Sequence, residues 1–175
     1  MTGAVVWFTG LPASGKTTLA VALRSELTAR GVASVLLDSD ALRPCLHPAP
    51  GYDDAGRAAF YATLASLAAL FESEGLVVLV AATAHRRAFR AHARANAKRF
   101  LEVFVDCDPS VCAARDPKGL YAAARGGELA GLPGVGATYE PPEHPEVHVD
   151  ARVESAIAVR TILTKLLAPS EGGAP

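Results

Sequence analysis

Residues 10–17 read Gly10-Leu11-Pro12-Ala13-Ser14-Gly15-Lys16-Thr17, a complete match to the phosphate-loop pattern G-x-x-x-x-G-K-[ST]. An apolar run at residues 5–8 precedes the loop and is typical of a strand, and residues 17–23 follow it with helical periodicity. In this setting the loop N–H groups can face an anion at the positive end of the helix. The alternative, an ordinary glycine turn that opens a helix, does not account for the agreement of all eight positions and both flanks. The loop therefore predicts that the chain binds a nucleoside triphosphate.

The loop also predicts which groups hold the triphosphate and its metal. Gly10 and Gly15 allow backbone geometries that a side chain would obstruct. Lys16 would reach the β- and γ-phosphates, and the hydroxyl of Thr17 would take a place on Mg²⁺. We therefore expect ATP and Mg²⁺ as cofactors and Lys16 as a catalytic residue. The predicted nucleotide-binding residues are Gly10, Leu11, Pro12, Ala13, Ser14, Gly15, Lys16, Thr17 and Thr18.

Length and composition limit what this chain can be. Its 175 residues fit one domain, expected at residues 1–168, with a disordered tail at 169–175. The net charge of −1 gives no reason to expect nucleic acid as a partner, and no apolar run approaches the roughly 20 residues that span a bilayer. The start lacks the features of a signal peptide, and the three cysteines lack C-x-x-C spacing. We therefore expect a cytoplasmic protein with reduced thiols and a small-molecule partner.

Strand-like and helix-like segments alternate along the chain. After the first strand, further strands are expected at residues 32–37, 76–82, 101–105 and 147–149. Helices are expected between them, at residues 57–73, 85–99 and 109–115, and a last one at 153–167. This pattern predicts an α/β fold, a five-stranded parallel sheet flanked by helices on both faces, with ligands at the carboxyl ends of the strands.

Two segments stand out from this alternation. Residues 116–145 are rich in Gly and Pro and are too long for a simple connection, so we expect a lid or binding loop there. The helix at residues 85–99 is strongly basic and carries few aromatic residues, which argues against a platform for single-stranded nucleic acid. We interpret its charges as a solvated helix face; the alternative is that Arg86 or Arg87 meets a substrate anion.

Two carboxylates, Asp38 and Asp40, lie where the second predicted strand ends. In a phosphoryl transferase, one carboxylate at this edge can help to organise hydrated Mg²⁺, and another can orient or deprotonate the acceptor hydroxyl. The alternative is a capped turn between strand and helix. Arg43 and Arg57 follow and could each grip an oxyanion with a planar fork of donors, unless they are ordinary surface arginines. Tyr52, between them, could stack on a base or simply cover the core.

Together these residues resemble the adenylylsulfate kinase family over residues 5–166. The phosphate loop fits many small kinases, whereas a later set of motifs is specific to this family. That set comprises Val105-Asp106-Cys107, Val111-Cys112, Arg115-Asp116-Pro117-Lys118-Gly119-Leu120-Tyr121 and Tyr139-Glu140-Pro141-Pro142. The resemblance implies a P-loop kinase fold with a lid, and transfer of the γ-phosphate of ATP to the 3′-hydroxyl of adenosine 5′-phosphosulfate (APS) in sulfate assimilation. Members often form dimers, so it also implies a homodimer.

The resemblance implies a role for individual residues. It implies that Asp40 is the partner of the acceptor hydroxyl. Asp38 and Thr17 are then the residues expected to bind Mg²⁺. Arg43 and Arg57 match substrate-binding arginines, and Tyr52 lies where the family carries a phenylalanine near the substrate adenine. Lys118 matches the lid lysine and would stabilise anionic oxygens during transfer. The catalytic residues are then Lys16, Asp40 and Lys118.

Departures from the family pattern all fall on the acceptor side. Phe60 replaces an asparagine, residues 61–63 replace Ile-Arg-Arg, Thr83 replaces a serine that can carry phosphate in some relatives, and Leu132-Pro133 replaces Phe-Thr. We therefore expect the anion-binding end to be kept and the base-binding end to be loosened. The predicted substrate-binding residues are Asp38, Asp40, Arg43, Tyr52, Arg57, Phe60, Thr83, Lys118 and Leu132.

Two other functions stay open from the sequence. A divergent kinase could phosphorylate another anionic, hydroxyl-bearing metabolite, such as a different nucleotide or an anionic sugar. A nucleotide-binding module without catalysis is the second alternative, and the retained Asp40 and Lys118 argue against it.

Overall fold

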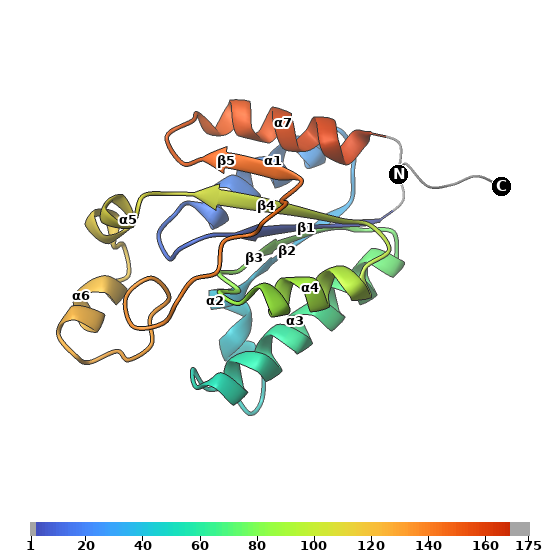
Figure 1. Ribbon diagram of the computed structural model, residues 1–175. Coiled ribbons are helices and arrows are strands. Elements are labelled where there is room, and N and C mark those ends of the chain that lie inside the picture. Colours follow the sequence, from blue (N-terminus) through green and yellow to red (C-terminus); the bar gives the residue numbers. More distant parts are fainter. Residues whose placement is uncertain (1–2, 169–175) are drawn as a thin grey trace.

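The computed structural model describes residues 3–168, so the tail predicted at 169–175 lies outside the described residues. Five parallel strands form one sheet in the order β2-β3-β1-β4-β5 (Figure 1). The strands are β1 (Ala4–Thr9), β2 (Ser34–Asp38), β3 (Val77–Ala81), β4 (Phe100–Asp106) and β5 (Val147–Asp150). The α/β class, the parallel sheet and the number of strands predicted from the sequence are confirmed.

Helices cover both faces of this sheet (Figure 1). On one face lie α1 (Lys16–Ala29) and α7 (Ser155–Leu167), and on the other lie α3 (Asp54–Ser73) and α4 (Arg87–Asn96). Every residue of β1 and β3 is buried, because a central parallel strand is covered on both faces and needs apolar side chains on both. Two apolar clusters result, one on each face, with Phe8 in the first and Trp7 in the second.

Short elements occupy the carboxyl edge of the sheet. They are α2 (Ser39–Leu42), the 3₁₀ turn η1 (Arg43–Cys45), α5 (Pro109–Arg115) and α6 (Leu120–Arg125), and of these only α5 was expected from the sequence. Helix α3 begins at Asp54, three residues earlier than predicted, because the Asp53 carboxylate accepts a hydrogen bond from the Gly56 N–H at 2.6 Å and caps the helix. No helix among residues 3–168 has the length and hydropathy needed to cross a bilayer.

Cys45, Cys107 and Cys112 form no disulfide with one another. Cys107 and Cys112 are buried beside the phosphate loop, whereas Cys45 is exposed.

The interpretation of the basic helix as a solvated face holds for Arg86, Arg87 and Lys98, which are exposed, but it is wrong for Arg90. Arg90 of α4 is 2% exposed; it donates to the Glu102 carboxylate at 2.7 Å and to the Glu140 carbonyl at 2.6 Å. One turn later, Arg94 binds the Glu146 carboxylate through two hydrogen bonds of 2.6 and 2.8 Å. Arginines three and four residues apart share one side of a helix, and here that side faces an acidic segment that returns from the lid.

These contacts anchor residues 139–146. The Glu140 carboxylate accepts from the Arg87 N–H at 2.7 Å, and the Arg87 guanidinium pairs with Glu143. Arg86 pairs with Asp54 at 2.8 Å, so the alternative that Arg86 or Arg87 meets a substrate anion finds no support in the geometry. The anchored segment takes up the end of the predicted lid, which leaves residues 116–138 over the edge of the sheet (Figure 1).

Candidate active site

A cavity of about 1050 Å³ opens at the carboxyl edge of the sheet, between the phosphate loop, α2, the start of α3 and the lid. Most of the predicted site residues line it: Pro12, Ala13, Ser14, Gly15, Lys16, Thr17, Thr18, Asp38, Asp40, Arg43, Tyr52, Arg57, Thr83, Lys118 and Leu132. Three predicted residues, Gly10, Leu11 and Phe60, do not line it, and each has another role. One cavity therefore joins the predicted nucleotide and acceptor sides.

The phosphate loop needs both of its glycines. Gly15 has a φ of 104° at the start of α1, a conformation that a side chain would strain. Gly10 has a φ of 148°, and a Cβ atom there would lie 2.4 Å from the Val105 carbonyl oxygen of β4. Gly10 therefore lets the loop pack against the sheet, which aims the start of α1 into the cavity.

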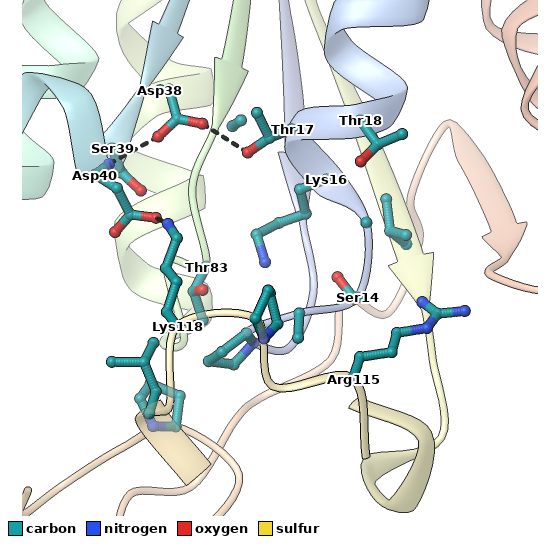
Figure 2. A pocket seen from close by; sticks show the side chains of 18 of the residues that line it. Ser14, Lys16, Thr17, Thr18, Asp38, Ser39, Asp40, Thr83, Arg115 and Lys118 are labelled. Atoms are coloured by element: carbon teal, nitrogen blue, oxygen red, sulfur yellow. Dashed lines mark hydrogen bonds and ion pairs between the residues drawn. The ribbon is translucent and has the colours of Figure 1, made fainter. Parts of the chain in front are cut away.

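Lys16 lies in the middle of the cavity, between Asp40 and Lys118 on one side and Ser14 and Arg115 on the other (Figure 2). Its ammonium donates to the carbonyls of Gly10 at 3.1 Å and Leu11 at 2.7 Å. These two residues position the lysine rather than line the cavity. Burial lowers the pKa of Lys16 to about 8, and the nearby Asp40 and Asp38 carboxylates only partly oppose this effect.

Asp38 does two things at once (Figure 2). Its Oδ1 accepts from the Asp40 N–H at 2.9 Å and caps α2, as the capped-turn alternative expected. Its Oδ2 accepts from the Thr17 hydroxyl at 2.6 Å. A hydroxyl and a carboxylate oxygen side by side at the mouth of a phosphate loop match the oxygen ligands that Mg²⁺ takes in such sites, so the residues fit this metal.

Asp40 and Lys118 meet across the cavity, although 78 residues separate them in the sequence. The Lys118 ammonium donates to Asp40 Oδ2 at 2.5 Å, and this hydrogen bond raises the pKa of Lys118. The lysine lies in a turn just before α6, where the Asp116 carboxylate accepts from the Tyr121 N–H at 3.1 Å and the Ala122 N–H at 3.0 Å. The lid thus delivers a cation to the carboxylate predicted to face the acceptor.

Arg43 and Arg57 are not ordinary surface arginines, because they are only 9% and 8% exposed. Arg57 donates to the Gly131 carbonyl of the lid at 2.7 Å. Arg43 donates to two loop carbonyls, and its guanidinium lies over the rings of Tyr52 and Phe60. Phe60, predicted to bind substrate, is 1% exposed and lies under Arg43 outside the cavity lining, so that prediction is wrong.

Thr83 and Leu132 line the cavity from different sides. The Thr83 carbonyl accepts from the Thr9 hydroxyl of β1 at 2.7 Å, so its position is fixed by the sheet. Leu132 is buried in a small apolar cluster with Cys112 and Tyr121 beside the phosphate loop. A leucine there fastens the lid to the loop.

Several lining residues were not predicted. Tyr121 donates to the Pro12 carbonyl at 3.0 Å and so supports the phosphate loop, and Arg115 contacts the sulfur of Cys107 at 3.8 Å. Both residues belong to the family motif at residues 115–121, and this membership could have predicted their place at the site. Tyr61 also lines the cavity, and its place among the departures at residues 61–63 was a signal for it. Val153 lines the cavity too, and nothing in its sequence context indicates it.

Comparisons with known proteins show the family of this chain. The sequence model described as "Adenylylsulphate kinase" matches residues 2–150. The chain belongs to the adenylylsulphate kinase family. It is 47% identical over 150 residues to adenylyl-sulfate kinase of Citrobacter koseri, which covers 85% of this chain and 75% of that protein. It is 42% identical over 174 residues to adenylyl-sulfate kinase of Burkholderia ambifaria, and the match covers 98% of this chain and 96% of that protein.

A solved structure of the same family extends the likeness to three dimensions. The Mycobacterium tuberculosis APS kinase CysC, in complex with AMPPNP and APS, superposes with a TM-score of 0.91 at 34% identity, covering 95% of this chain and 99% of that one. The P-loop kinase fold and the family resemblance drawn from the sequence are therefore confirmed. As an adenylylsulphate kinase family member, the chain is an ATP-binding phosphotransferase with an alcohol group as acceptor.

Proposed function

We propose that this chain transfers the γ-phosphate of ATP to the 3′-hydroxyl of APS, as in sulfate assimilation. The observation that carries the proposal is the meeting of Lys16, Asp40 and Lys118 in one cavity with two buried arginines. The relative solved with AMPPNP and APS supports it, since that chain shares nearly the whole of this fold. Three free thiols fit the reducing cytoplasm in which we place the enzyme. A homodimer stays a prediction from the resemblance.

The phosphate loop would bind ATP. Loop N–H groups at the start of α1 would face the phosphates, and the Lys16 ammonium would leave the carbonyls of Gly10 and Leu11 for the β- and γ-phosphate oxygens. Thr17 and Asp38 would hold Mg²⁺, which supplies positive charge to the phosphates when it is bound. Their existing contact brings the two oxygens to one place before any ligand enters.

Asp40 would receive the proton of the acceptor hydroxyl. As that O–H bond breaks, the acceptor oxygen forms a new bond to the γ-phosphorus, the bond from that phosphorus to the bridging β,γ-oxygen breaks, and ADP leaves. Lys118, which pairs with Asp40, would offset the negative charge of the transferring group. Arg43 and Arg57 would bind the anionic end of the acceptor, and Tyr52 offers a ring face to its base.

An acceptor panel tests this proposal. We expect ADP formation from ATP to require an acceptor, and kcat/KM to be highest for APS among APS, other nucleotides and anionic sugars. Leu132 stands where the family pattern carries a phenylalanine, which removes a stacking contact to the base worth about 1 to 3 kcal/mol. We therefore expect the efficiency to be below that of the Burkholderia ambifaria relative assayed alongside. Strong turnover of another acceptor with none of APS would identify a divergent kinase. No turnover with any acceptor would identify a nucleotide-binding module.

Nucleotide affinity should depend on pH through Lys16. Because burial holds its pKa near 8 while bound phosphates favour the charged amine, nucleotide binding above pH 8 must take up a proton. We therefore expect the affinity for ADP with Mg²⁺ to be level below about pH 7.5 and to fall above pH 8, by up to about tenfold per pH unit. Calorimetric titrations between pH 6.5 and 9.5, in buffers of different ionisation enthalpy, measure the affinity and the number of protons taken up on binding. Lys16→Arg stays charged throughout and should give a flat profile, and a flat profile for the unchanged protein would contradict the prediction.

Residues 116–138 should act as a lid. Their polar contacts to the body of the protein include the exposed Lys118–Asp40 pair and the Arg57–Gly131 hydrogen bond, while residues 139–146 are anchored by α4. We expect hydrogen exchange at 116–138 to slow when ADP, Mg²⁺ and APS are all present, and exchange at 139–146 to be slow with or without them. Equal exchange at 116–138 in both states would mean that the lid does not close on these ligands.

A further inference from the structure

We propose that Phe60 is a positioning residue for Arg43: together with Tyr52 it holds the guanidinium in place through cation–π contacts, and so it sets the affinity for the acceptor anion without touching it. This inference rests on the proposed function, because it assigns the acceptor's anion to Arg43. It concerns a position at which this chain carries a ring that the family pattern does not.

The guanidinium of Arg43 lies over two aromatic rings and is hydrogen-bonded at one corner. Its central carbon lies 3.9 Å from the centre of the Phe60 ring and 4.4 Å from the centre of the Tyr52 ring. Its Nη1 donates to the carbonyls of Pro50 at 3.0 Å and Gly51 at 2.9 Å. Two ring contacts and two hydrogen bonds at one corner restrict the position and the rotation of this planar group.

The rest of that plane is available to a ligand. Within residues 3–168, no protein group accepts a hydrogen bond from Nε or Nη2 of Arg43, and the side chain lines the cavity. Phe60 has no polar atom that could take these donors. An asparagine at this position would offer an amide oxygen and could accept one of them. The aromatic residue therefore leaves the guanidinium edge free for an oxyanion, which planar N–H donors bind well.

The Phe60 ring is a rigid support. It is 1% exposed and meets the Tyr61 ring edge-on, with 5.4 Å between centroids and an interplanar angle of 61°. A cation over an aromatic face is attracted more strongly where water is excluded, as it is on this side of Arg43. Tyr52 also contacts the guanidinium but is 63% exposed, so the buried Phe60 ring provides the fixed support.

Phe60→Leu tests the support while keeping an apolar side chain in the core. We expect the KM for APS to rise about tenfold, equivalent to about 1.4 kcal/mol, with kcat and the KM for ATP each within twofold of the unchanged protein. Phe71→Leu makes the same substitution later in α3, in the same apolar cluster and away from the cavity, and serves as the control. Thermal unfolding of both variants shows that each is folded.

A double-mutant cycle asks whether Phe60 acts through Arg43. In an Arg43→Ala background, Phe60→Leu should change the KM for APS by less than twofold. Tyr52→Leu should also raise that KM, in part through the lost contact with the base, so only the part of the rise that disappears in the Arg43→Ala background reports on Arg43. If Phe60→Leu does not fold, Phe60→Met, which keeps a larger apolar side chain, takes its place in the same cycle.

Three results would overturn the proposal: an unchanged KM for APS in Phe60→Leu, an equal rise in the Arg43→Ala background, or equal losses in kcat and in the KM for ATP. Failure of the proposed function is a different result, since the unchanged protein would then show no turnover of APS at all.

Discussion

Lys16→Ala is expected to lower turnover by at least about 10³-fold, which corresponds to about 4 kcal/mol of transition-state stabilisation. The reason is geometric. Lys16 is the cation at the centre of the cavity, and its ammonium already lies against the two loop carbonyls that orient it. Charge develops on the bridging and γ-phosphate oxygens during transfer, and Lys118 would reach these oxygens from the acceptor side rather than from the loop.

The measurement is ADP formation at saturating ATP and acceptor. Lys165→Ala, the same substitution on an exposed position of α7, should leave turnover unchanged and controls for handling and folding. Burial of the charged Lys16 amine costs free energy of folding, so replacing this lysine with alanine should not destabilise the fold. A variant that kept more than about a tenth of the original turnover, a loss of only about 1.4 kcal/mol, would refute the assignment of this loop.

Asp40→Asn is expected to lower kcat by about 10²- to 10⁴-fold while nucleotide affinity stays within a fewfold of its original value. The substitution keeps the size of the side chain and removes the base that would receive the acceptor proton. Asp40 is exposed and caps no helix, since the cap of α2 is Asp38, so the local structure should survive. Lys118 loses its ionic partner, which should lower the pKa of Lys118 towards its ordinary value.

Two parallel variants separate this role from others. Asp54→Asn changes an exposed carboxylate that pairs with Arg86 outside the cavity, and it should leave kcat unchanged. Asp38→Asn should instead raise the Mg²⁺ concentration needed for half-maximal activity, because Asp38 contacts Thr17. Loss of nucleotide binding in Asp40→Asn, measured by calorimetry, with turnover retained at saturating ATP, would place Asp40 in the metal site and contradict the assignment.

The sequence by itself determined the fold and half of the site. Residues 10–17 carry their own backbone requirements, because the glycines, the lysine and the hydroxyl act within one short loop. Apolar runs separated by helical periodicity require a parallel sheet with both faces covered, and the carboxyl ends of parallel strands meet at one edge. Asp38 and Asp40 were placed correctly for that reason.

Only the tertiary structure decided what the acceptor side and the basic helix do. The contacts that decide this join residues far apart in the sequence. The separation is 78 residues for Lys118 and Asp40, 74 for Arg57 and Gly131, and 52 for Arg94 and Glu146. Whether a charged or aromatic side chain faces solvent, a partner or a ligand depends on which distant segment packs against it. Local periodicity reports which side of its own element a residue occupies. For this reason the sequence could mark Phe60 as unusual but could not show that its ring lies beneath Arg43.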